Sequence, residues 1–140
     1  MNNQIHPCLW FDGQAKEAAT FYCGIFKNSK ITAETPLVVN FELNGNKFMG
    51  LNGGPMFKFN EAVSFVVDCD TQEEIDYYWN KLTEGGSESQ CGWLKDKFGL
   101  SWQIVPTVLG KLMSDAEKAP RVIQAFMKMK KFDIETLMNA

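Results

Sequence analysis

The chain has 140 residues and a mass of 15.9 kDa, the size of one domain with a single core or two small modules that share one. Its 14 Lys and Arg residues against 17 Asp and Glu residues give a net charge near −3, which argues against a nucleic-acid-binding surface. No apolar run approaches the roughly 18–20 residues that span a bilayer, and the polar start of the sequence lacks the pattern of a signal peptide. We therefore expect a cytoplasmic protein of one domain, residues 1–140, that contacts neither nucleic acid nor membrane.

Residues 1–60 are predicted to form a βαβββ module. Asp12 is a candidate N-cap for the helix, and Asn44-Gly45 is a dipeptide typical of a tight hairpin turn. The elements expected, in chain order, are a strand over residues 4–11, a helix from Ala15 to Ile25, and strands over residues 31–35, 37–43 and 47–52.

Residues 61–106 are predicted to repeat this order. Thr71 and Glu74 form the Thr-x-x-Glu pattern of a capping box, and Gly85-Gly86 marks the end of the helix. The elements expected are a strand over residues 62–69, a helix whose apolar stripe runs from Ile75 to Leu82, and strands over residues 87–90, 91–95 and 100–106. A shift of the first module by 58 residues aligns strand, cap and helix anchor together, placing His6 on Ser64, Leu9 on Val67, Asp12 on Asp70 and Phe21 on Trp79.

Residues 107–140 form a helical C-terminal extension with three short apolar stripes and several methionines. Such an amphipathic tail needs to bury its apolar side. We expect it to pack on its own sheet or across a second copy of the chain, and we favour a homodimer.

Alternate residues of a strand point to opposite faces of a sheet, so each predicted strand divides into two sets. The wholly apolar sets should face the helices. The other sets combine aromatic, small and polar groups, which is the composition of a small-molecule cleft. The residues expected to line this cleft are His6, Cys8, Trp10, Phe48, Asn52, Ser64, Ser101 and Gln103.

A structural interpretation competes with a functional one at each of these positions. Ser64 and Ser101, taken singly, are better explained as core polar groups that bond to backbone or to a buried water. His6 and Gln103 together favour function, because a buried imidazole and amide both need several hydrogen-bond partners. Cys8 could pair with His6 as a nucleophile if its pKa were lowered, although a structural thiol is the simpler interpretation for all four cysteines.

Four stretches, HPCLWFDGQAKEAATFY, LNGGPMFKF, SFVVDC and QCGWLKDKFGLSWQIVP, resemble in this order the PhnB-like branch of the vicinal oxygen chelate superfamily. This superfamily includes glyoxalase I, bleomycin resistance proteins and extradiol dioxygenases. Residues 121–129 are similar to the branch's RV-x-x-A-x-M-x-M helix. The resemblance implies an α+β fold in which two βαβββ modules form an open half-barrel followed by C-terminal helices, often as a dimer with exchanged modules.

The resemblance also implies where a metal ion would bind. The superfamily's metal enzymes draw four ligands from the first and fourth strands of each module, and these places are similar to His6, Asn52, Ser64 and Gln103 here. A catalytic metal site needs about three His or carboxylate ligands, and this set holds one His and no carboxylate. Asp68 could enter the site if the register differed. We expect no cofactor, and the alternative is a divalent metal held by His6 and Gln103.

These observations predict a small-molecule-binding protein without strong metal chemistry, and they leave open whether it catalyses a reaction. One alternative is a metal-dependent lyase, isomerase or dioxygenase; another is a structural or interaction role for the dimer. The branch is often labelled 3-demethylubiquinone 3-methyltransferase. We do not expect that activity, because the sequence lacks a strand, a glycine-rich turn and an acidic residue in the order of an S-adenosylmethionine site.

Overall fold

The computed structural model describes residues 3–140, and the chain divides into two compact units, Met1–Phe59 and Asn60–Ala140. Each unit has its own four-stranded sheet and its own buried residues. Within residues 3–140, none of the helices has the length and apolar composition needed to cross a bilayer.

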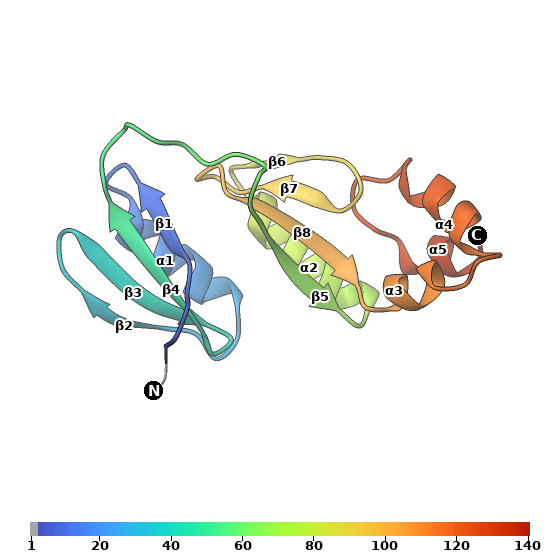
Figure 1. Cartoon of the computed structure of the whole chain (residues 1–140), viewed down its shortest axis with the longest axis horizontal. Helices are drawn as coiled ribbons and strands as arrows, with labels where there is room; N and C mark the ends of the chain where they lie inside the picture. The colour runs from blue at the N-terminus through green and yellow to red at the C-terminus, as the bar shows by residue number, and fades with distance from the viewer. Residues whose placement is uncertain (1–2) are drawn as a thin grey trace. The chain divides into compact units, whose positions relative to one another are not determined.

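The first unit is a βαβββ module (Figure 1). Its strands lie in the order β1-β4-β3-β2, with β1 parallel to β4 and the other neighbours antiparallel. The elements are β1 (Cys8–Phe11), α1 (Ala15–Ile25), β2 (Lys30–Glu34), β3 (Val38–Leu43) and β4 (Asn46–Asn52).

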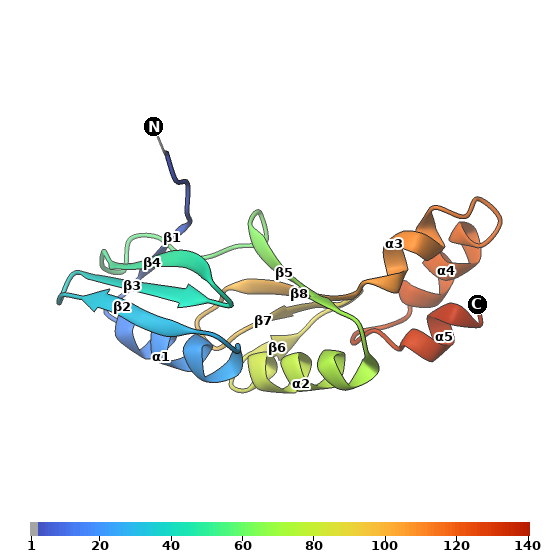
Figure 2. The same ribbon diagram turned by 90° about the horizontal axis from the view of Figure 1, so that it is seen from below.

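Helix α1 covers one face of this sheet (Figure 2). Its buried side begins with three alanines, Ala15, Ala18 and Ala19, whose small side chains let the helix lie close to the strands. A Cβ added at Gly50 would lie only 3.1 Å from the Cβ of Ala15, so β4 needs a glycine beneath the start of the helix. Tyr22 continues the buried side and stacks on a phenylalanine of β3.

The ends of two strands follow from local backbone chemistry. Asn44 and Gly45 both adopt positive φ angles, +50° and +80°, which are the angles that a two-residue hairpin turn of type I′ requires. Strand β1 begins at Cys8, later than the expected residue 4, because Pro7 has no N–H to donate to a ladder. Pro7 still accepts a hydrogen bond of 3.0 Å from the backbone N–H of Met49.

The second unit repeats the module and adds three helices. Its strand order, β5-β8-β7-β6, reproduces that of the first sheet, and α2 covers one face (Figure 2). The elements are β5 (Ser64–Cys69), α2 (Gln72–Thr83), β6 (Ser87–Glu88), β7 (Trp93–Lys95), β8 (Ser101–Pro106), α3 (Val108–Met113), α4 (Ala119–Phe126) and α5 (Ile134–Met138). The predicted α+β fold of two βαβββ modules with C-terminal helices is therefore confirmed, and each described sheet is open rather than a closed barrel.

Side-chain hydrogen bonds define the ends of two elements in the second unit. The predicted capping box is present at the start of α2: the Thr71 hydroxyl accepts from the Glu74 N–H, and the Glu74 carboxylate accepts from the Thr71 N–H. Between β7 and β8, the buried Asp96 carboxylate accepts from the backbone N–H groups of Phe98 and Leu100 and from the indole N–H of Trp102.

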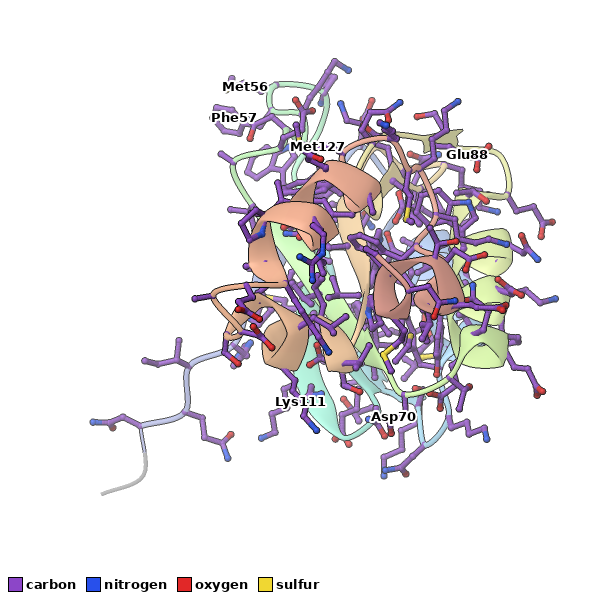
Figure 3. All side chains as sticks on the ribbon, turned by 90° about the vertical axis from the view of Figure 1, so that its right-hand side faces the viewer. Met56, Phe57, Asp70, Glu88, Lys111 and Met127 are labelled. Carbon is purple, nitrogen blue, oxygen red and sulfur yellow. The ribbon has the colours of Figure 1, made fainter. Side chains whose placement is uncertain are left out.

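The C-terminal extension packs on its own unit. Cys91 and Gly92 donate backbone hydrogen bonds of 2.8 Å to the carbonyls of Met129 and Lys130. The Gln72 side chain of α2 donates to the Phe132 carbonyl and accepts from the Ile134 N–H. These contacts are with the sheet and helix of the same unit, which is one of the two positions expected for the tail. Lys111 and Met127 lie exposed on the surface of the extension (Figure 3).

Candidate ligand-binding site

The first sheet has a covered face and an open face. The residues of β1 alternate between them: Leu9 and Phe11 are buried against α1, whereas Cys8 and Trp10 lie on the open side. The register places Cys8 opposite Met49, and Met49 opposite Asn40. Because neighbouring residues across a ladder share a face, these side chains all belong to the open face.

A hollow of about 340 Å³ lies on this open face. His6 borders it from the extended segment before β1, and Lys47 and Glu42 bring opposite charges from facing positions of β4 and β3. The lining also includes the imidazole of His6, the amide of Asn40, the hydroxyl of Thr32 and the thioether of Met49. It therefore offers both hydrogen-bond donors and acceptors. The residues around the hollow are His6, Thr32, Asn40, Phe41, Glu42, Lys47, Phe48 and Met49.

Trp10 lies on the open face but is not among the residues that border the hollow. Its indole N–H donates a hydrogen bond of 2.8 Å to the Gly54 carbonyl, and its ring meets Phe57 edge to face with centroids 4.8 Å apart. A Cβ added at Gly53 would lie 2.4 Å from the Trp10 ring, so the backbone of this loop lies directly against the indole. The sequence does not reveal this role of Gly53 and Gly54, because the glycines there also fit an ordinary turn.

The structure does not bring Asn52 to the open face. Its partner across the ladder is Phe11, which is buried against α1. The Asn52 carbonyl oxygen accepts a 2.9 Å hydrogen bond from the Ala15 N–H at the start of α1, and its amide nitrogen donates to the Pro36 carbonyl at 3.1 Å. This corrects the expected assignment: Asn52 anchors the helix, and its amide is already used.

Phe48 occupies an intermediate position. By strand alternation it shares a side with Gly50 and Asn52, and its ring stacks on the buried Phe41 with centroids 5.5 Å apart. It nevertheless borders the hollow. Phe48 therefore belongs mainly to the core of the first unit and only partly to the expected lining.

The repeat shows which residue stands where Asn52 was expected. Cys8 pairs with Met49 in the first sheet, and its counterpart Val66 pairs with Gln103 in the second. Met49, not Asn52, is therefore the first-module equivalent of Gln103. The sequence could have indicated Met49 through the 58-residue repeat, if the strands of both modules were assumed to pair in the same register.

The second sheet brings Ser64, Ser101 and Gln103 to one face. Ser64 pairs with Ser101, and the Gln103 amide donates a 3.0 Å hydrogen bond to the Ser64 hydroxyl. The opposite side carries Trp102 and Ile104, which are buried beneath α2. His6 belongs to the first unit and Gln103 to the second, so their predicted meeting in one cleft stays a prediction.

Three of the cysteines, Cys8, Cys23 and Cys69, have a pKa raised by desolvation. Desolvation raises the pKa of Cys8, and it raises the pKa of the buried Cys69 to about 12 with help from nearby carboxylates. A raised pKa disfavours the thiolate that a nucleophile needs. The raised pKa of Cys8 therefore argues against this thiol as a nucleophile paired with His6.

The residues do not fit a divalent metal site. Within residues 3–140, no three His, Cys, Asp or Glu side chains gather closely enough to hold a metal ion. The repeat relates His6, just before β1, to Ser64 in β5, and it relates Met49 in β4 to Gln103 in β8. Their side chains are one imidazole, one hydroxyl, one thioether and one amide. Neutral oxygen ligands do little to offset the dehydration of a divalent ion.

Comparison with known proteins places the chain in a family. The model of the family described as 3-demethylubiquinone-9 3-methyltransferase matches residues 3–105. Among solved structures, the chain is similar to a PhnB protein from Bacillus cereus, with 32% identity over 75% of this chain and 100% of that one and a TM-score of 0.68. No match was found among curated proteins.

Two more distant structures share the fold. One is the fosfomycin resistance protein FosX from Listeria monocytogenes, in a complex with Mn(II) and sulfate, with 14% identity over 81% of this chain and 97% of that one and a TM-score of 0.61. The other is a glyoxalase-related enzyme from Fulvimarina pelagi, with 13% identity over 76% and 89% and a TM-score of 0.55. The chain therefore belongs to the family described as 3-demethylubiquinone-9 3-methyltransferase, which includes the similar PhnB protein from Bacillus cereus.

Proposed function

We propose that the chain binds a small molecule on the open face of its first sheet. The observation that carries this proposal is the hollow of about 340 Å³ beside β3 and β4. Ligand pockets have volumes of about 300–1,000 Å³ and combine apolar walls with a few polar groups. The hollow meets both conditions at the small end of the range.

The lining indicates the chemistry of the ligand. Met49 and Phe48 offer apolar contact, while Lys47 and Glu42 offer a cation and a carboxylate at neighbouring positions. Asn40 adds an amide that both donates and accepts hydrogen bonds. A compact molecule with an apolar body and polar substituents of both kinds matches this lining better than a purely apolar one.

The family's description as a methyltransferase does not carry over to this chain's residues. S-adenosylmethionine bound in the doubly wound manner needs parallel strands and a glycine-rich turn between strand and helix. Here β1 and β5 each have a single parallel neighbour. The turn between β1 and α1 holds one glycine, Gly13, and the turn between β5 and α2 holds none. These residues do not fit the cofactor, and we assign no methyl-transfer step.

Native mass spectrometry of protein purified without chelator tests the proposal. We expect a small molecule to be retained by the wild-type protein, or to be acquired from a metabolite extract. Asn40→Arg places a long, charged side chain in the hollow and should abolish this adduct. Thr20→Arg is the matched control, because Thr20 is exposed on α1 and does not border the hollow.

Three results would contradict the proposal. The first is a wild-type protein that neither carries nor acquires a compound. The second is an adduct that survives Asn40→Arg. The third is an adduct lost equally in both variants, which would place the compound elsewhere.

A further inference from the structure

Ser101 is a buried polar residue whose side chain has no hydrogen-bond partner. The residue is 0% exposed, and within residues 3–140 its hydroxyl is the one buried side-chain polar atom that lacks a partner. Burying an unsatisfied hydroxyl costs more free energy than burying the methyl group of alanine. Such a group is explained when something absent from the chain itself completes its hydrogen bonding.

The neighbours of Ser101 have unused hydrogen-bonding capacity on the same face. Ser64 stands opposite Ser101 in the ladder, and Gln103 follows on the same side of β8. The Gln103 amide uses one N–H to bond the Ser64 hydroxyl. A hydroxyl that accepts one bond can still donate its proton, and an amide carbonyl accepts up to two bonds.

The surroundings of this group carry no excess charge. Lys95, the β7 neighbour of Ser101, forms an ion pair with Glu61. Val66 and Trp93, the ladder neighbours of Gln103, supply apolar surface. A carboxylate or phosphate would therefore meet a lysine whose charge Glu61 already balances, and a metal ion would find only neutral oxygens.

We propose that Ser64, Ser101 and Gln103 form a subsite for an uncharged hydrogen-bonding group, a hydroxyl, carbonyl or amide, attached to an apolar body. The subsite lies in the second unit and does not depend on the hollow of the first.

Three probes with the same apolar body test the charge preference. 2-Naphthalenemethanol is neutral, 2-naphthoate is anionic and 2-naphthylmethylammonium is cationic. Each is titrated into ¹⁵N-labelled protein while the side-chain amide signals of Gln103, identified by their loss in Gln103→Glu, are followed. We expect the alcohol to shift these signals and to bind at least fivefold more tightly than either ion. Tighter binding of an ion, or no shift with any probe at millimolar concentration, would overturn the proposal.

Ser101→Ala separates a ligand site from a structural role, with the exposed Ser89→Ala as the control. We expect Ser101→Ala to leave the Tm of the free protein unchanged or raised, because an unsatisfied hydroxyl is removed, and to weaken binding of the alcohol about five- to tenfold. Unchanged affinity would overturn the proposal. A lowered Tm with unchanged affinity would assign the hydroxyl to a buried water instead. Asn40→Arg alters only the hollow of the first unit, so failure of one proposal is distinguishable from failure of the other.

Discussion

Asn52 connects three parts of the first unit through one side chain. Its carbonyl oxygen caps the first turn of α1 at Ala15, and its amide holds the loop at Pro36. We expect Asn52→Ala to lower the free energy of unfolding by about 1–2 kcal/mol, because two hydrogen bonds are lost and a helix-terminal N–H is left unpaired. Urea denaturation measures this change. Asn3→Ala, at an exposed position, is the control, and an equally small effect of both variants would contradict the capping role.

Asp96 has a comparable role in the second unit. Its buried carboxylate accepts from two backbone N–H groups and from the indole of Trp102. Asp96→Asn turns one accepting oxygen into a donor, so whichever way the amide is oriented, an N–H donor faces another donor. We expect a loss of about 1–3 kcal/mol of stability and a changed ¹H–¹⁵N signal of the Trp102 indole. An indole signal that keeps its wild-type position would show that the carboxylate does not hold the ring.

The extension after β8 is joined to α2 by charged and amide groups. Lys131 and the Gln72 amide bond the Asp76 carboxylate and hold the pKa of this group below its ordinary value. A lowered folded-state pKa stabilises the fold at pH values above the unfolded pKa of about 3.9. This contribution is lost as the pH falls through the folded-state value. The tail should therefore be held less tightly in acid.

Amide hydrogen exchange of Ile134, whose N–H donates to the side-chain oxygen Oε1 of Gln72, tests this attachment. We expect Asp76→Asn to reduce the protection of this amide at neutral pH. The difference from wild type should shrink below about pH 4, where Asp76 begins to be protonated. The effect is small, because the ion pair is substantially exposed. A difference that persists unchanged in acid would show that the charge of Asp76 has no part in it.

Most helix and strand positions follow from short sequence motifs that can be recognised without knowledge of the tertiary structure. Thr71 and Glu74 predict the start of α2, and Asn44-Gly45 predicts the hairpin between β3 and β4; both are found. These signals are local because each depends on hydrogen bonds or φ angles within a few residues.

The pairing of β4 with β1 is not a local signal, and there the prediction of the site is incomplete. Alternation along β4 correctly places Phe48, Gly50 and Asn52 on one face of the sheet. It does not reveal whether this is the open face or the face covered by α1. The polar Asn52 suggested the open face. The ladder pairs it with the buried Phe11, and Met49 takes the open position. In β8, where Trp102 and Ile104 form a plainly apolar set, the faces of Ser101 and Gln103 were predictable.

At the scale of the whole molecule, the homodimer stays a prediction from the sequence. Several large apolar side chains are exposed on the chain, among them Phe57 at 59%, Met127 at 61% and Met56 at 78% (Figure 3). Burying such surface in a partner is favourable by about 25 cal/mol per Å². We expect sedimentation equilibrium to give twice the monomer mass of 15.9 kDa at micromolar concentration. A single species at the monomer mass would contradict the dimer.

The proposed function is tested most directly at Met49, which borders the hollow. The chain has seven methionines, so a methyl-labelled sample gives a simple spectrum, and Met49→Leu identifies the signal of interest. Addition of the compound that the wild-type protein retains, to protein freed of it, should shift the Met49 methyl signal in proportion to occupancy and leave that of Met138 in α5 unchanged. A Met49 signal that stays in place while the compound binds would show that the hollow of the first unit is not its site.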